Sequence, residues 1–244
     1  MKLFECAHCG GKHALPTSQQ AFDEAQQLFE KVVSEKTIAI FGHGRHSMSL
    51  ETLCRPGKGK MLGVLHYRVP ETLKEGYLYG FSGQFDDEFE LMGYVPALIN
   101  YGVMGAHKRA TEKILDALGE TIATLRDPKD KLALKQRRKM ISQALMQDIF
   151  SLYRPVTKSG EVLQLRDAWA ATTGIPAATG DCCAPKLLQE ANKSRYEVLG
   201  VAEIFVGSAR SQSDQVHGQF SEPCTQKCEP LLGAMLCEEK RSSQ

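Results

Sequence analysis

Apolar residues recur at helical spacing in three segments of the chain. In residues 18–35 the apolar side chains fall three or four positions apart, which is the period of one face of a helix. Residues 106–125 and 129–153 repeat this pattern on either side of a short Asp-Pro break. Two neighbouring amphipathic helices of this length predict a helical hairpin, inserted into the rest of the chain at residues 106–155.

Shorter apolar runs predict strands. Residues 60–69 and 76–81 are rich in aromatic and β-branched side chains, and the polar PETLKE sequence between them favours an antiparallel hairpin. Residues 196–206 form a nearly continuous apolar run that is typical of a buried strand. A further short strand is expected at residues 37–41.

Three shorter helices are expected in the C-terminal third. They cover residues 163–173, residues 182–193 and a segment opened by Pro223. Together these elements predict a single α/β domain over residues 1–244, with a small mixed or antiparallel sheet flanked by helices. Residues 1–15 form a separate N-terminal segment that contains a Cys-x-x-Cys turn.

Composition narrows the possible environments. The formal net charge is +1, so the overall charge gives no reason to expect nucleic-acid binding. The N-terminus lacks the apolar run of a signal peptide, and no stretch approaches the ~20 apolar residues of a membrane span. We therefore expect a cytoplasmic protein with no membrane partner. Its eight cysteines are then better explained by metal ligation, nucleophilic catalysis or burial than by disulfides.

Four of the cysteines in the C-terminal third stand near predicted helix starts. Cys182 or Cys183 would begin one helix, and Cys224 and Cys228 would begin another, with a strand between them. Helix N-termini stabilise thiolates, and three thiolates that converge would bind zinc. His217 or a water molecule would complete the coordination.

This order of elements resembles the zinc deaminase fold, in which one ligand opens a helix and Pro-Cys-x-x-Cys opens the next. The present chain has three residues between its second pair of cysteines, and Ala184 stands two positions after Cys182, where deaminases carry a catalytic Glu. The resemblance implies deaminase-like layering of sheet and helices. It also implies metal-assisted hydrolysis or deamination of a small-molecule or nucleobase-like substrate, with Asp181 and His217 as candidate acid–base groups.

The same residues allow two other interpretations. Gly180, Asp181 and Cys182 at the start of a helix, with His217 downstream, also resemble papain-like and transglutaminase-like sites. In that interpretation Cys182 is a nucleophile and His217 its base, in a metal-free hydrolase or acyl transferase. Alternatively, these cysteines are only core and cap residues, because cysteine is among the most often buried side chains.

A second metal half-site is expected near the N-terminus. Cys6 and Cys9 have the spacing of a zinc knuckle. His8, His13 or the distant Cys54 could complete it, or the pair could join the C-terminal cysteines. A glycine turn with incidental thiols is the simpler explanation.

Several unusual strings occur in an order that resembles a known bacterial region. They are GKMLGVLHYR, GYLYGFSG, GDCCAPKLL, VLGVAEIFVG, HGQF and PCTQKCEPLLGAML. They resemble the N-terminal accessory region of long RluA-type pseudouridine synthases, over residues 58–83 and 160–237. The Arg-Leu-Asp catalytic motif of that family is missing, which implies a freestanding accessory module. The resemblance implies an association with RNA or with an RNA-modifying enzyme, and it leaves open a non-catalytic binding module.

Overall fold

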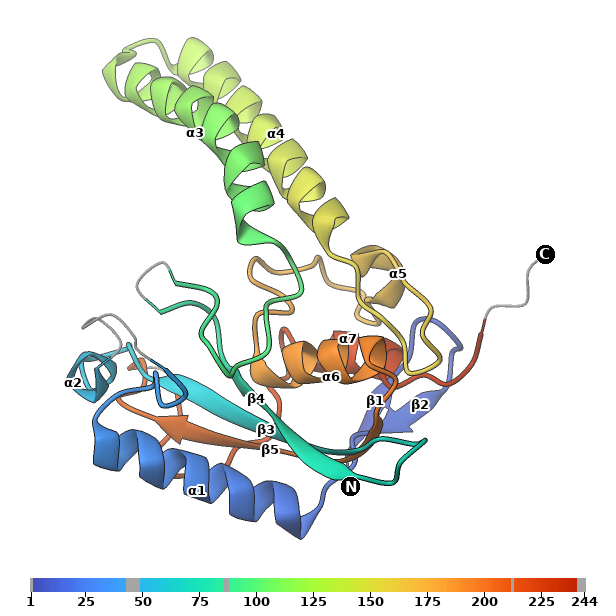
Figure 1. Cartoon of the computed structure of the whole chain (residues 1–244). Helices are drawn as coiled ribbons and strands as arrows, with labels where there is room; N and C mark the ends of the chain where they lie inside the picture. Colours follow the sequence, from blue (N-terminus) through green and yellow to red (C-terminus); the bar gives the residue numbers. More distant parts are fainter. Residues whose placement is uncertain (1, 43–48, 86–87, 212, 241–244) are drawn as a thin grey trace. The chain divides into compact units, whose positions relative to one another are not determined.

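The computed structural model of the chain describes residues 2–42, 49–85, 88–211 and 213–240 (Figure 1). The chain divides into two compact units. The sheet unit comprises Met1–Leu98 and Pro155–Gln244, and the hairpin unit comprises Ile99–Arg154.

The sheet unit is built on a three-stranded antiparallel sheet in the order β4-β3-β5. The central strand β3 (Lys60–Arg68) pairs with β4 (Glu75–Phe81) on one side and with β5 (Glu197–Val206) on the other. A smaller antiparallel pair is formed by β1 (Leu3–Glu5) and β2 (Lys12–Ala14). The predicted fold class, a small antiparallel sheet flanked by helices, is confirmed.

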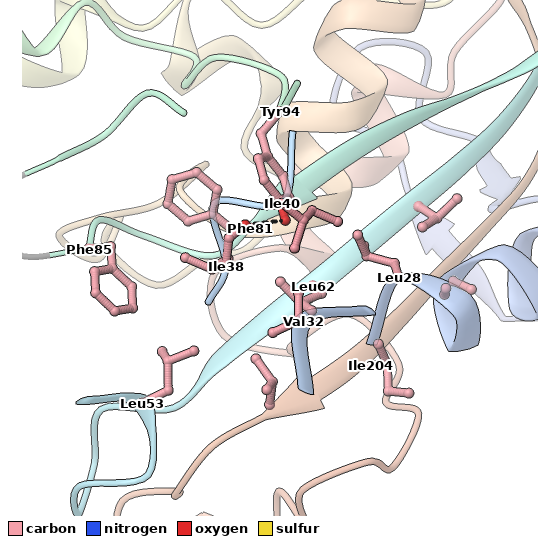
Figure 2. Close-up of a cluster of buried hydrophobic side chains, with 14 of the residues drawn as sticks. Leu28, Val32, Ile38, Ile40, Leu53, Leu62, Phe81, Phe85, Tyr94 and Ile204 are labelled. Atoms are coloured by element: carbon pink, nitrogen blue, oxygen red, sulfur yellow. Dashed lines mark hydrogen bonds between the residues drawn. The ribbon is translucent and has the colours of Figure 1, made fainter. Parts of the chain in front are cut away.

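One face of the sheet is covered by α1 (Gln19–Glu35), whose first turn is capped by the Ser18 side chain. The hydrophobic core lies here (Figure 2). It contains side chains from α1, from the sheet and from the segments that follow α1 and β4, including Leu28, Val32, Ile38, Ile40, Leu53, Leu62, Phe81, Phe85, Tyr94 and Ile204.

The prediction of a strand at residues 37–41 is wrong. Only Thr37 forms an isolated bridge, to Ser49. Ile38 and Ile40 are buried in the core, and the Tyr94 hydroxyl donates a 2.8 Å hydrogen bond to the Ile38 carbonyl. The apolar run therefore reflects burial of side chains rather than pairing in a sheet.

The other face of the sheet is covered by α6 (Cys183–Lys193), with α7 (Glu229–Met235) beside it (Figure 1). Glycines allow α6 to lie unusually close. A Cβ added at Gly63 of β3 would lie 2.5 Å from the Cys183 Cβ, and one at Gly80 of β4 would lie 3.3 Å from Leu187. This close contact fixes where α6 begins relative to β3 and β5.

Two predicted helices are shorter than expected. The segment at 163–173 contains only α5 (Leu165–Ala168), because Trp169 turns to an extended conformation and its indole donates to the Thr173 carbonyl. The last helix does not begin at Pro223. Residues 225–228 form a turn, and α7 starts only at Glu229, followed by Pro230 in its first turn. A short helix α2 (Leu50–Leu53) precedes β3.

The hairpin unit consists of α3 (Tyr101–Thr124) and α4 (Pro128–Leu152), which pack against each other. Asn100 caps α3 and Asp127 caps α4, and Pro128 occupies the first turn of α4, where a proline is well tolerated. Both helices predicted for the hairpin are confirmed. Among the described residues, no helix combines the length and the apolar character needed to cross a bilayer.

The contact at Gly63 gives a prediction for stability. Gly63→Ala should lower the free energy of unfolding by about 1–3 kcal/mol, because the added methyl group overlaps Cys183 and Leu187. Gly174→Ala is the matched control, since an added Cβ there meets nothing within 4 Å. Urea denaturation of both variants checks this, and equal stabilities would mean that α6 does not depend on the close approach.

Candidate metal centre

Three cysteines from distant parts of the sequence meet on the α6 face of the sheet. The Sγ atoms of Cys182, Cys224 and Cys228 all lie within 4.8 Å of one another. The Cys182–Cys224 distance is 3.9 Å and the Cys224–Cys228 distance is 3.3 Å. All eight cysteines lie among the described residues, and none forms a disulfide. We call this group the three-cysteine centre.

Local structure explains how these thiols converge. Cys182 is the N-cap of α6. Cys224 and Cys228 belong to one turn, in which the amides of Cys228 and Glu229 donate to the Cys224 carbonyl. Residues four apart in such a turn lie on the same side. The three-residue spacing, which departs from the deaminase pattern, therefore still brings both sulfur atoms together.

Of the two adjacent cysteines, Cys182 and not Cys183 belongs to the centre. Cys183 is fully buried against the sheet, and its thiol donates to the Met61 carbonyl at 3.2 Å. Burial raises the pKa of the Cys183 thiol well above its usual value. Cys183 is thus a core residue.

Close contact between the three thiols shifts their pKa values in opposite directions. Contact with the Cys182 and Cys228 thiols lowers the pKa of Cys224 to about 2. The same contacts with Cys224 raise the pKa of Cys182, and contacts with Cys182 and Cys224 raise that of Cys228. Cysteine binds metal as a thiolate, so binding of a divalent ion at this centre would release protons.

A buried carboxylate lies beneath the centre. Glu203 of β5 is 5% exposed, and its carboxylate accepts a 2.7 Å hydrogen bond from the Ala184 amide in the first turn of α6. Burial raises the pKa of Glu203 to about 7, and the charge of Cys224 acts in the same direction. The loop that carries Cys224 is tied to the same residue, because the Ser221 amide donates to the Glu203 carbonyl.

Glu203 is not among the site residues predicted from the sequence. The signal was available, since Glu203 is the only charged side chain in the apolar run from Val198 to Val206. A charged residue at an inward position of a buried strand requires a partner. The sequence could not show that this partner is the amide of Ala184, the position where a deaminase would carry its own Glu.

A cavity of about 540 Å³ opens beside the three-cysteine centre. Cys182 and Cys224 form part of its wall, together with Asp181. The remaining charged side chains in its lining are basic, namely Lys60, Arg210 and Lys227. The cavity is therefore suited to a polar ligand that carries negative charge.

Asp181, a predicted acid–base group, lies next to Cys182 in the cavity wall. Its carbonyl accepts a 2.7 Å hydrogen bond from the Gly83 amide, which ties the start of α6 to the end of β4. The preceding Gly180 has φ +84°, a left-handed conformation that suits glycine and turns the chain into α6.

The structure does not bring His217 to the cysteines. The His217 ring packs edge-on against Phe29 of α1, with centroids 5.0 Å apart, and its Nδ1 accepts a hydrogen bond from the Gly207 amide. Helix α1 and helix α6 cover opposite faces of the sheet (Figure 1). His217 is thus placed neither as a fourth ligand of the centre nor as a base for a Cys182 nucleophile.

The N-terminal pair belongs to a different cluster. Cys6 and Cys9 lie with His13 and Cys237, and not with the three-cysteine centre. Cys54, which the sequence analysis considered as a partner, is exposed and belongs to neither group. Each of the two clusters could hold a metal ion.

Comparison of the chain with models of protein families, with curated proteins and with solved structures gave no match.

The adjacent pair Cys182 and Cys183 gives a sharp test of the centre. Cys182→Ser should abolish metal binding at the three-cysteine centre, because it removes one of three thiols. Cys183→Ala should retain that metal and lose about 1–2 kcal/mol of stability, because only a buried contact is removed. Metal analysis and thermal denaturation of both variants check this, and the reverse pattern would assign the ligand to Cys183.

Proposed function

We propose that this protein is a zinc-dependent hydrolase of the deaminase type, with its reaction centre at Cys182, Cys224 and Cys228. The observation that carries the proposal is the convergence of these three thiols in the wall of a polar cavity. Cysteine thiolates favour zinc over magnesium or calcium. Three protein ligands leave a fourth coordination position for water or substrate, as in catalytic zinc sites.

A zinc ion bound there would supply an activated water molecule at neutral pH. Glu203 is the group that we assign to proton transfer. Its carboxylate binds the Ala184 amide, two residues after the first ligand, which is the position from which deaminases present their catalytic Glu. A carboxyl group whose pKa lies near neutrality can both accept and return a proton.

Three features support a nucleobase-like substrate that carries phosphate. The small antiparallel sheet carries helices on both faces, as the proposed deaminase-like arrangement requires. Lys60, Arg210 and Lys227 in the cavity lining suit phosphate oxygens. The resemblance to an accessory region of pseudouridine synthases adds an association with RNA or with an RNA-modifying enzyme. Free thiols at both clusters suit a reducing compartment such as the cytoplasm.

The proposal predicts the behaviour of two variants. Cys224→Ser should lose the zinc of this centre and all activity. Glu203→Gln should keep the zinc and fold, because the amide oxygen can still accept from Ala184, yet lose activity at least about 100-fold through loss of proton transfer. The assay is ammonia release from amino-bearing nucleosides, nucleotides and short RNA oligonucleotides, with zinc content measured in parallel.

Cys54→Ser is the matched control, because Cys54 is an exposed thiol outside both clusters. It should leave zinc content and activity unchanged. Zinc content that is unaffected by Cys224→Ser, or ammonia release that survives Glu203→Gln, would contradict the proposed function.

A further inference from the structure

A second group of potential metal ligands lies outside the proposed reaction centre. It is formed by Cys6, Cys9 and His13 near the start of the chain and by Cys237, more than two hundred residues later. The four potential ligand atoms all lie within 4.8 Å of one another. In a tetrahedral zinc site with Zn–S bonds of about 2.3 Å, neighbouring sulfur atoms are about 3.8 Å apart. The group is therefore close to the dimensions of a zinc site.

The turn between β1 and β2 is shaped around its two sulfur atoms. The Cys6 amide donates to the Gly11 carbonyl, and the Gly10 amide donates to the Cys6 carbonyl, both at 2.9 Å. Two further amides point at sulfur: that of Cys9 at the Cys6 Sγ, at 3.5 Å, and that of Gly11 at the Cys9 Sγ, at 3.3 Å. Amide donors stabilise a thiolate, which is the form that binds metal.

Strand pairing and helix packing supply the other two ligands. His13 lies on β2, and its Nε2 is 3.2 Å from the Cys9 Sγ. Cys237 follows α7 and is fully buried. It can reach the turn because a glycine lets α7 lie against β1: a Cβ at Gly233 would be only 2.0 Å from the Glu5 carbonyl oxygen.

The N-terminal strands are short. Each contains only three residues, and an isolated pair of such strands is not stable in water. Phe4 is their buried anchor, at 1% exposure. A metal ion held by residues of both the strand pair and the segment after α7 would therefore fix the two segments together.

We infer that Cys6, Cys9, His13 and Cys237 bind one zinc ion that is structural. Three sulfur ligands and one imidazole nitrogen complete a tetrahedral coordination and leave no position for substrate. This ion fastens the β1–β2 segment to the end of α7. It is separate from the ion at the three-cysteine centre, where only three protein ligands are present among the described residues.

The test is zinc content per chain, measured on untagged, reduced protein for Cys9→Ser, Cys237→Ser, Cys224→Ser and the control Cys54→Ser. Wild type and the control should hold two zinc ions. Cys9→Ser and Cys237→Ser should each hold one and melt about 10 °C lower, because the stabilising ligand is lost. Cys9 is only partly buried, so Cys9→Ser tests ligation even if Cys237→Ser fails to fold.

The outcomes separate this inference from the proposed function. Loss of one zinc in Cys9→Ser supports the structural site whether or not Cys224→Ser loses the other. A Cys9→Ser variant with the zinc content and melting temperature of wild type would overturn the inference. Loss of ammonia release in Cys9→Ser that is still folded and retains the zinc removed by Cys224→Ser would also overturn it, because the N-terminal site would then serve catalysis directly.

Discussion

The close approach of α6 to the sheet is the constraint on which the rest of the site depends. Gly63 and Gly80 remove the side chains that would hold α6 away, and Cys183 and Leu187 fill the space. The buried Lys186 ties α6 to the end of β4, since its ammonium group donates to the carbonyls of Phe81 and Gly83 at 3.0 Å. With α6 held in this way, its first turn meets β5 at Glu203, and Cys182 is presented to the cavity.

Cysteines of the C-terminal segment also lie on the α6 face of the sheet. The loop after β5 returns to the sheet at Ser221 and delivers Cys224 and Cys228 to the start of α6. Helix α7 continues from that turn and packs on β1 through Gly233, and Cys237 follows its end. The segment from Cys224 to Cys237 therefore contributes to both clusters. Cys224 and Cys228 belong to the three-ligand centre, and Cys237 belongs to the four-ligand group. In our account the first ion serves chemistry and the second serves stability.

Local patterns in the sequence predicted the elements well where periodicity was strong. The three long helices and all three strands of the main sheet follow from it. In α1 the regularly spaced apolar residues Ala25, Leu28 and Val32 are buried. The strand predicted at residues 37–41 is absent, because a short apolar run looks the same in the sequence whether its side chains are buried in a strand or in a loop. Cys182, Cys224 and Cys228 could be grouped from their positions at predicted helix starts. His217 could not be excluded, nor Cys237 and Glu203 found, because their places depend on which face of the sheet each segment reaches.

The central claim is that thiolates of this chain hold zinc at two sites, and X-ray absorption at the zinc edge tests it most directly. Six cysteines shared between two ions give an average of three sulfur ligands per zinc, at about 2.3 Å, with lighter atoms completing the shell. That spectrum, measured on zinc-loaded reduced protein, is the result that the account predicts. A shell made mainly of oxygen and nitrogen, with one sulfur or none per zinc, would contradict it.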